Sequence, residues 1–204
     1  MKERGMIFNA EMVNAILSGR KTQTRRPIKW KQTRFTEIAE RDDGSLWPWA
    51  EDCERGGDIW FTCPFGEVGD RIWVRETFRV HSRATDVATL VYRASVRNSW
   101  TEQTHRVPVA VCNKPATPEK WTPSIHMPRW SSRITLEITD VRVERLNSIT
   151  ESDAEAEGVT DTGFDDLLVD GFRYLWKSIY GYDSWQANPW VWVIEFKRVE
   201  GGAA

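Results

Sequence analysis

Residues 72–80 read Ile72-Trp73-Val74-Arg75-Glu76-Thr77-Phe78-Arg79-Val80. Apolar side chains recur at every second position, and this alternation is typical of a half-buried β-strand. Glu76 falls on the apolar face of that strand. A buried carboxylate is costly unless it is paired or hydrogen-bonded, so Glu76 is predicted to belong to a structural ion pair or to a reactive site. We expect its cationic partner in the basic segment 19–26.

The composition is that of a globular protein. The chain has 204 residues, of which 40% are hydrophobic and 28% charged, which fits one domain over residues 1–200 with a disordered tail at 201–204. We find no run of eighteen apolar residues and no signal-peptide pattern, and therefore expect a cytoplasmic protein without membrane contact. The three cysteines form no CxxC pair, and we predict neither a metal site nor a cofactor.

Charge is distributed unevenly although the net charge is only -2. Every charge between residues 12 and 36 is positive, and every charge between residues 146 and 172 is negative. The first segment is either a solvated loop or a surface that attracts phosphate, while the second keeps another surface acidic. The small net charge argues against a protein that coats nucleic acid through its overall field.

Twelve tryptophans are an unusual number for a chain of this length. Trp190 and Trp192 share one face of an apolar segment and are expected in the core. Six others lie in segments without periodicity, where they either clamp loops or offer stacking platforms to flat ligands such as bases. These are Trp30, Trp47, Trp49, Trp100, Trp121 and Trp130.

The order of predicted elements indicates an α+β fold around a curved or closed sheet. A strand at 6–8 precedes a helix that Asn9 begins and Gly19 ends. Further strands are predicted at 90–94, 107–111, 133–146 (one bent strand or two) and from Trp190 onward, the last one central. A short helix is predicted at 150–158, where Thr150 and Asp153 resemble a capping box, and an amphipathic helix at 164–179. Two long irregular insertions are expected near 29–66 and 97–130.

Lys21 and Thr24 are the pair most suited to chemistry. A helical turn would bring the amine and the hydroxyl together, whereas an extended strand would place them on opposite faces. Lys21 could then take a proton from Thr24 or from water, and the nucleophile could attack an acyl carbon, with Glu76 orienting Lys21 or protonating the leaving nitrogen. The alternative is structural: the basic residues hold phosphate, and Glu76 pairs with an arginine to fix the fold.

Several segments resemble the ASCH domain in its larger phage and prophage form. They are Ile16-Leu17-Ser18-Gly19-Arg20-Lys21-Thr22-Gln23-Thr24-Arg25, the stretch 69–78, the stretch 126–134 and the stretch 145–158. The resemblance implies a fold similar to that of the RNA-binding PUA domain, a small β-barrel with flanking helices and, in this chain, two long insertions. Some small members of the family remove the acetyl group from N4-acetylcytidine with a lysine, a threonine and a glutamate, and their lysine and threonine match Lys21 and Thr24.

The resemblance favours a nucleobase-sized pocket. Lys21, Thr24 and Glu76 are its expected catalytic residues, with Glu76 assigned from alternation. The substrate-binding residues we expect are Arg20, Arg25, Arg26, Arg75, Arg129 and Trp130. The partner is then a modified nucleoside or single-stranded RNA or DNA. Two alternatives stay open: a binding module without catalysis, and a phage accessory protein that binds a host protein.

Overall fold

The chain divides into two compact units. The computed structural model describes residues 1–30, 37–52, 54–160 and 167–199. The first unit consists of Met1–Gly19, Asp70–Glu137 and the segment from Arg198, and the second consists of Arg20–Gly69 and Ile138–Lys197. The predicted tail at 201–204 lies outside the described residues.

The first unit begins with a strand and a helix. Strand β1 (Glu3–Ile7) pairs in parallel with β6 (Arg71–Arg75), and β6 pairs antiparallel with the start of β10 (Thr135–Arg145), which gives the order β1-β6-β10. Helix α1 (Ala10–Leu17) follows β1, and the side chain of Asn9 caps it by accepting from the backbone N–H of Met12 at 2.8 Å. The expected cap at Asn9 is therefore confirmed.

The expected continuous strand over 72–80 is interrupted at Glu76. Strand β6 ends at Arg75, and β7 (Phe78–Arg83) begins in a different sheet. The backbone N–H of Glu76 contacts the sulfur of Met127 at 3.1 Å, and the carbonyl of Thr77 accepts from the N–H of Arg93. The chain thus changes sheets where the buried carboxylate lies, and the alternation alone could not show this.

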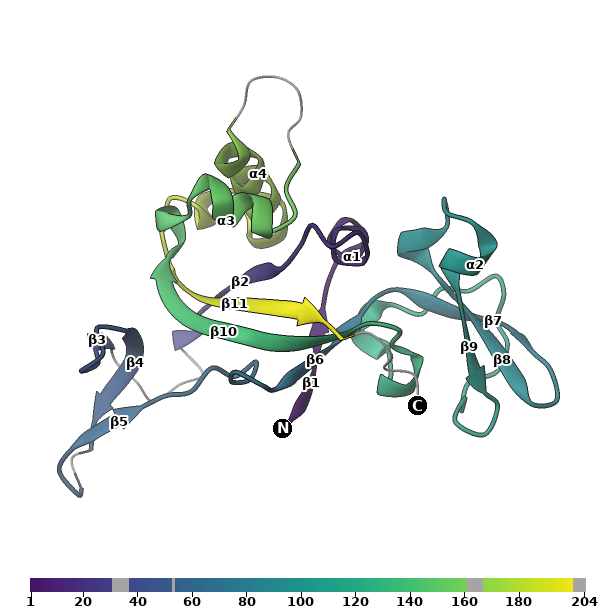
Figure 1. The fold of residues 1–204 in the computed structure, drawn as a ribbon, viewed down its shortest axis with the longest axis horizontal. Coiled ribbons are helices and arrows are strands. Elements are labelled where there is room, and N and C mark those ends of the chain that lie inside the picture. Colours follow the sequence, from purple (N-terminus) through teal and green to yellow (C-terminus); the bar gives the residue numbers. More distant parts are fainter. Residues whose placement is uncertain (31–36, 53, 161–166, 200–204) are drawn as a thin grey trace. The chain divides into compact units, whose positions relative to one another are not determined.

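Strand β7 opens a three-stranded antiparallel sheet, β7-β8-β9 (Figure 1). Its other strands are β8 (Val87–Tyr92) and β9 (Thr104–Pro108), with the short helix α2 (Trp100–Gln103) between them. The strand predicted at 107–111 therefore begins and ends earlier, and the insertion expected near 97–130 contains regular structure. The core on this sheet consists of Phe78, Val80, Ala88, Leu90, Tyr92, Val107, Cys112 and Met127.

The second unit contains the predicted central strand. Strand β11 (Trp190–Arg198) lies between the second part of β10 and β2 (Gln23–Pro27), and it pairs antiparallel with β2. The helices α3 (Glu151–Ala156) and α4 (Leu168–Tyr180) lie side by side (Figure 1). Their core with β11 includes Leu146, Ala154, Phe172, Trp176, Val191 and Val193. Residue 164, the predicted start of the longer helix, lies outside the described residues.

The insertion expected to be irregular near 29–66 contains a small sheet. Its strands are β3 (Glu37–Glu40), β4 (Leu46–Glu51) and β5 (Asp58–Trp60), in the order β3-β4-β5. Trp49 and Trp60 are cross-strand partners, and Trp47 packs against Trp192 with ring centroids 5.2 Å apart. The polar residues and prolines of this segment predicted an irregular loop. Aromatic cross-strand pairs stabilise it as a sheet.

The structure is a mixed α+β fold with several sheets and few helices, as expected. Each described sheet runs between two edge strands, so the expected closed barrel is not shown. None of the helices in the described residues is long and apolar enough to cross a membrane.

Candidate functional site

Lys21 is completely buried in an ion pair with Glu157. Its Nζ lies 2.6 Å from Glu157 Oε2 and donates to the backbone carbonyl of the same residue at 2.8 Å. The exposed fraction of the two side chains is 0% for Lys21 and 2% for Glu157. The backbone is tied at the same place, because the N–H of Thr22 donates to the carbonyl of Ala156 at 2.8 Å. Two segments far apart in the sequence thus build one polar centre.

Helix α3 places Glu157 at this centre. Thr150 and Asp153 form a capping box at its N-terminus, as the sequence predicts, and Glu157 is the C-terminal cap residue. The backbone N–H of Glu157 donates to the carbonyl of Asp153 at 2.8 Å. The capping box stabilises the first turn of α3, and the hydrogen bond from Glu157 to Asp153 ties the end of the helix to that turn. The carboxylate of Glu157 is thereby held next to Lys21.

Arg25 joins the centre from strand β2. Its side chain is fully buried, and its Nη2 lies 3.1 Å from Glu144 and 3.2 Å from Asp153. Its Nη1 lies 3.7 Å from Glu157 Oε1, which is an ion pair but not a hydrogen bond. From the sequence, Arg25 is expected to bind substrate. In the structure it lies buried among three carboxylates, and its binding role stays a prediction.

Arg142 forms the more exposed side of the cluster. It donates to Glu144 of the same strand, β10, at 2.6 Å and to Glu195 of the neighbouring strand β11 at 2.5 Å. It also donates to Gln23 Oε1 at 3.1 Å. These bonds raise the pKa of Arg142 although burial alone would lower it. Arg142 thus holds the amide oxygen of Gln23, and it shares the carboxylate of Glu144 with Arg25.

Burial shifts the ionisation of this centre. Desolvation lowers the pKa of Lys21, and the charge of Glu157 opposes the shift only in part. Burial would raise the pKa of Asp153, yet its hydrogen bonds with Thr150 and the charge of Arg25 lower it overall. A lysine with a depressed pKa can act as a general base at lower pH than an exposed lysine.

Four polar atoms of this centre make no hydrogen bond of normal geometry within the described residues. They are Gln23 Nε2, Arg25 Nε, Arg25 Nη1 and Glu157 Oε1, and all three residues are at least 97% buried. Arg25 Nη1 and Glu157 Oε1 nevertheless face each other as an ion pair at 3.7 Å. The Gln23 side chain also helps to lower the pKa of Asp153, so its amide lies near that carboxylate.

Thr24 is buried on β2 and pairs with Ile194 of β11. Because side chains alternate along a strand, Thr24 lies on the face opposite to Gln23 and Arg25. The helical turn that would bring Lys21 and Thr24 to one side is therefore not what the chain forms. The catalytic role of Thr24 stays a prediction.

Glu76 is buried, as predicted, but its partner is Arg133. Arg133 Nε and Nη2 donate to the two carboxylate oxygens at 2.9 and 3.0 Å, and Arg133 also donates to Ser95 at 2.9 Å. The Arg133 guanidinium lies over the Tyr92 ring at 4.1 Å. The expectation of a partner in segment 19–26 is wrong. Glu76 belongs to the first unit, whereas Lys21 belongs to the second and pairs with Glu157.

The surroundings of Glu76 favour its neutral form. Desolvation raises its pKa, and Arg133 opposes the rise. The same burial raises the pKa of Tyr92 and lowers that of His105. The bidentate pair and the donation of Tyr92 to the carbonyl of Ser131 at 2.7 Å are features of a structural network.

The other expected binding residues divide between the units. Arg20 donates to the carbonyl of Gly158 at 3.4 Å, close to the Lys21 centre, and Arg26 is half-buried on β2. In the first unit, Arg75 donates to the carbonyls of Ser124 and Ile125, and Arg129 pairs with Glu3 at 2.9 Å. Trp130 meets Phe78 edge-to-face at 6.2 Å and packs on the core. Trp130 therefore clamps a loop there.

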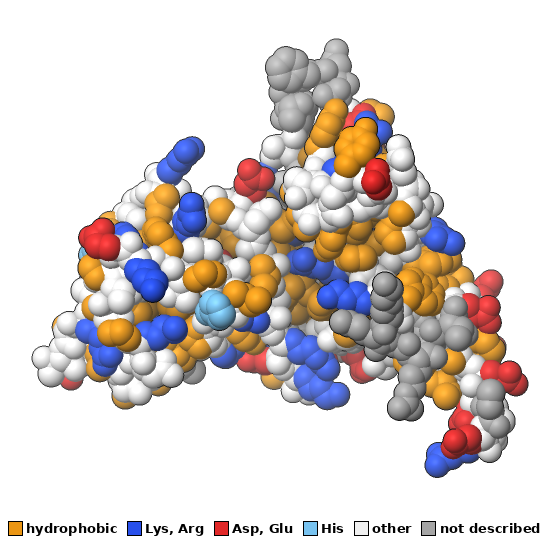
Figure 2. All heavy atoms as spheres, turned by 180° about the vertical axis from the view of Figure 1, so that it is seen from behind, with side chains coloured by type: hydrophobic (Ala, Val, Ile, Leu, Met, Phe, Trp, Pro, Cys, Tyr) orange, Lys and Arg blue, Asp and Glu red, His pale blue; other side chains and the backbone are white. Residues whose placement is uncertain are grey.

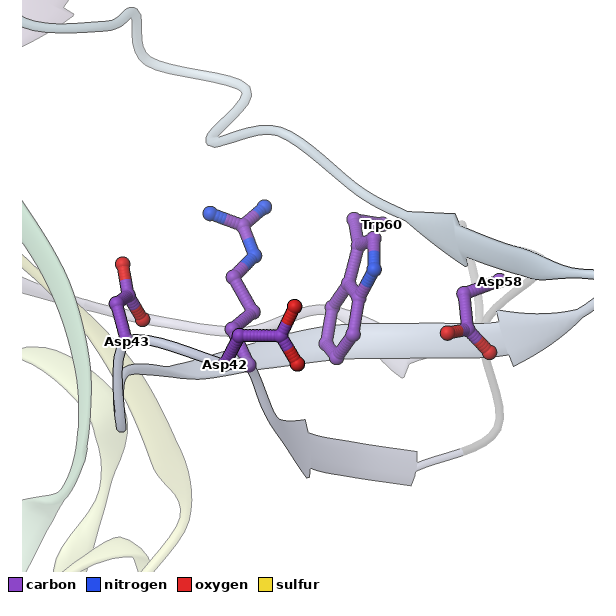
Figure 3. A pocket seen from close by; sticks show the side chains of 5 residues that line it. Asp42, Asp43, Asp58 and Trp60 are labelled. Atoms are coloured by element: carbon purple, nitrogen blue, oxygen red, sulfur yellow. The ribbon is translucent and has the colours of Figure 1, made fainter.

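A cavity of about 330 Å³ lies in the β3-β4-β5 sheet. Its lining consists of Arg41, Asp42, Asp43, Asp58 and Trp60 (Figure 3). Acidic side chains also stand out on this part of the surface (Figure 2). Three carboxylates against one guanidinium disfavour a phosphate group, so the cavity is not the expected nucleic-acid site.

Sequence reasoning missed Glu157, Glu144 and Arg142. Glu157 lies beside Gly158 at the end of the predicted short helix, within a segment that resembles the ASCH domain. The available signal was a glutamate at the C-terminal cap of a helix, directly before a glycine. Glu144 and Arg142 carry no such signal, because alternating charges on a strand are usual on a solvated face.

Comparison with known proteins leaves the family open. No family model matches the chain, and no curated protein matches it. A solved structure similar to it is the crystal structure of an ASCH domain from Lactobacillus crispatus JV V101. The identity is 13%, the TM-score is 0.41, and the match covers 97% of this chain and 79% of the other. The function proposed below therefore rests on the residues of this chain.

Proposed function

We propose that the Lys21–Glu157 centre hydrolyses the amide of an N4-acylated cytosine nucleoside without a metal. The observation that carries the proposal is a fully buried ammonium 2.6 Å from a fully buried carboxylate. Burial lowers the pKa of Lys21, which favours its neutral amine, and a neutral amine is a general base. The hydrogen bond with Glu157 fixes the position of that amine.

The reaction uses both members of the pair. The Lys21 amine, held in place by Glu157, takes a proton from water as the water oxygen bonds to the acyl carbon. The bond from that carbon to N4 then breaks, and the Lys21 ammonium gives the proton to the leaving nitrogen. The products are a carboxylic acid and cytidine, and Lys21 is again neutral. This differs from the expectation from sequence only in the carboxylate, which is Glu157 in place of Glu76.

The resemblance of segment 16–25 to the ASCH domain supports the choice of substrate. Its lysine and threonine occur in the same local context as those of the acetylcytidine-hydrolysing members. Thr24 competes with water as the nucleophile. A Thr24→Val variant that retains turnover supports water, whereas loss of turnover together with an acyl group on Thr24 of the wild type, detected by mass spectrometry, supports the hydroxyl.

The test is release of cytidine from N4-acetylcytidine, followed by chromatography. Lys21→Met and Glu157→Gln are expected to reduce turnover by about a hundredfold or more. Glu76→Gln is the matched control, since it alters an equally buried, cation-paired carboxylate in the other unit. Thermal unfolding of each variant separates loss of activity from loss of fold. Absence of cytidine release by the wild type, or equal loss in Glu76→Gln, contradicts the proposal.

A second candidate is a module that binds single-stranded nucleic acid without catalysis. Stacked arginine and tryptophan side chains favour it, with Arg145 over Trp190 at 4.2 Å and Arg79 over Trp121 at 4.6 Å. Such pairs offer a base-stacking ring beside a phosphate-binding cation. Quenching of tryptophan fluorescence by oligonucleotides, with affinity that falls steeply with salt, is the expected result. Binding that does not respond to salt contradicts this candidate.

A further inference from the structure

We infer that the small sheet β3-β4-β5 binds an arginine side chain in a basic segment of another protein. The inference goes beyond the proposed hydrolysis, because it concerns a different part of the second unit. Residues 37–60 carry eight acidic side chains and two arginines, a net charge of -6 in a chain whose total is -2. An excess of this kind on one sheet attracts cations and repels anions.

One face of this sheet gathers aromatic side chains. Trp49 lies opposite Trp60 across β4 and β5, and Trp47 lies two residues before Trp49. Because side chains alternate along a strand, the three rings share that face, and so does Asp58, two residues before Trp60. The indole N–H of Trp49 donates to the Asp58 carboxylate at 2.8 Å and holds it there. The cavity of about 330 Å³ thus has an aromatic wall, Trp60, beside an anchored carboxylate.

The chain's own Arg41 shows which kind of cation these rings accept. Its guanidinium lies 4.2 Å from the ring centroid of Trp47 and 5.2 Å from that of Trp60. Both are cation–π contacts, and a planar guanidinium stacks on a ring in a way that a compact ammonium does not. Arg41 forms no ion pair with any carboxylate in the described residues, so the acidic lining of the cavity is not used up by it.

Two carboxylates of the cavity are open to a second cation. In the view of Figure 3, Asp42 and Asp58 lie on opposite sides of Trp60. Asp42 is exposed, and its carboxylate takes part in no hydrogen bond or ion pair with the described residues. One oxygen of Asp58 accepts from Trp49, and the other has no partner in that part of the chain. A guanidinium stacked on Trp60 would meet these acceptors with the N–H groups along its edges.

The free edge of β5 favours a polypeptide as the source of this cation. In the described sheet β5 pairs with β4 alone. At the two ends of β5, the carbonyl of Gly57 and the N–H of Phe61 bond across to the β4 side. By the alternation of an antiparallel ladder, the backbone groups of Asp58 and Trp60 then point toward the free edge.

An extended segment that pairs with this edge would place every second side chain on the face that carries Trp60. Like charges directly opposite each other destabilise a pair of strands, whereas opposite charges stabilise it. The acidic side chains of the sheet therefore reject another acidic strand and select a basic one. The occupant that fits both the edge and the cavity is an extended segment with arginine at alternate positions.

The experiment is a titration of a fluorescein-labelled peptide, in which arginine alternates with threonine, with the full chain at low salt. Fluorescence anisotropy measures the affinity. Two matched peptides replace arginine by lysine, which keeps the charge, or by citrulline, which keeps the planar group and loses the charge. The arginine peptide is expected to bind at least about threefold more tightly than the lysine peptide and at least about tenfold more tightly than the citrulline peptide. Its affinity falls as salt is added.

Asp42→Asn and Asp58→Asn test the site, since both keep the size of the side chain and Asp58→Asn keeps an oxygen that accepts from Trp49. Each is expected to weaken binding of the arginine peptide by about threefold, and the double variant by about tenfold. Trp60→Leu removes the stacking surface and is expected to bring the arginine peptide to within about twofold of the lysine peptide. Asp86→Asn is the matched control, because it removes one exposed carboxylate of the first unit, and it should leave the affinity unchanged.

Absence of binding to the arginine peptide, or equal binding of the arginine and citrulline peptides, overturns the inference. Equal binding of the arginine and lysine peptides removes the stacked guanidinium. The same loss in Asp42→Asn as in Asp86→Asn assigns the binding to the net charge of the chain and not to this sheet. Free spermine that competes as strongly as the arginine peptide assigns the cavity to a polyamine, and the protein partner is then withdrawn.

Discussion

Lys21 Nζ and Glu157 Oε2 meet at 2.6 Å although 136 positions separate the two residues in the chain. Strand β2 follows Lys21, and Glu157 is the C-terminal cap residue of helix α3, so the pair joins a sheet to the helix that packs on it. Removing one partner from such a buried pair leaves an uncompensated charge and costs about 3–5 kcal/mol. The contact therefore matters for stability whether or not it performs chemistry.

The activity is expected to rise with pH through the ionisation of Lys21. A general base works in its deprotonated form, and burial places the folded-state pKa of Lys21 below 10.5. The pH profile of kcat/KM should therefore increase at pH values where a surface lysine is still fully charged. The Glu76→Gln variant should give the same profile, and a flat profile across that window contradicts Lys21 as the base.

The sign of the stability linkage at Lys21 follows from the same shift. The folded state holds its proton less tightly than the unfolded state, so this group makes the protein more stable as pH rises toward 10.5. Lys21→Met should remove that slope. Denaturant unfolding of both proteins at a series of pH values measures the difference, and equal slopes would contradict a depressed pKa.

Arg133→Met should destabilise the first unit by about 3–5 kcal/mol, since it leaves Glu76 buried without a cation. The double variant Glu76→Gln/Arg133→Met should recover a large part of this loss, because no charge is then buried. Loss of Arg133 also raises the folded-state pKa of Glu76 further above 4.5, so the deficit of the single variant should shrink as pH falls. Chemical denaturation gives both effects, and additive single effects would argue against coupling.

Thr150→Ala should cost about 1 kcal/mol by removing the capping box of α3. Thr150→Ser is the control, since it keeps the hydroxyl that accepts from the N–H of Asp153 at 3.2 Å. Because α3 positions Glu157, Thr150→Ala should also weaken the proposed hydrolysis more than Thr150→Ser does. Thermal unfolding and turnover of N4-acetylcytidine measure the two effects, and identical behaviour of the variants would contradict the role of the cap.

Gly5→Ala should destabilise the pairing of β1 with β6. A Cβ at this position would lie 2.5 Å from Cζ2 of Trp73, its cross-strand partner, and overpacking of this kind costs about 1–3 kcal/mol. Shortening the neighbour in Gly5→Ala/Trp73→Thr should relieve part of the cost. Denaturation midpoints test this, and a Gly5→Ala protein as stable as the wild type would show that Trp73 moves aside freely.

Local patterns predicted the elements that depend on nearby residues. The cap at Asn9, the capping box at Thr150 and the apolar strand from Trp190 follow from side chains within a few positions, and the structure confirms them. The strand at 72–80 was read as continuous because alternation passes through Glu76 unchanged. The small sheet of β3, β4 and β5 was missed because its stability depends on cross-strand aromatic contacts, which leave no periodic trace.

By itself, the sequence determined that the chain forms an α+β fold and that the carboxylate of Glu76 is buried, since alternation and composition are properties of neighbouring residues. Only the tertiary structure decided which charges meet. It joined Lys21 to Glu157 and Glu76 to Arg133, because pairing in a low-dielectric interior depends on distances of a few ångströms between segments remote in the chain. Packing thus determines which charged residues become partners, and it thereby determines which residues are proposed for catalysis.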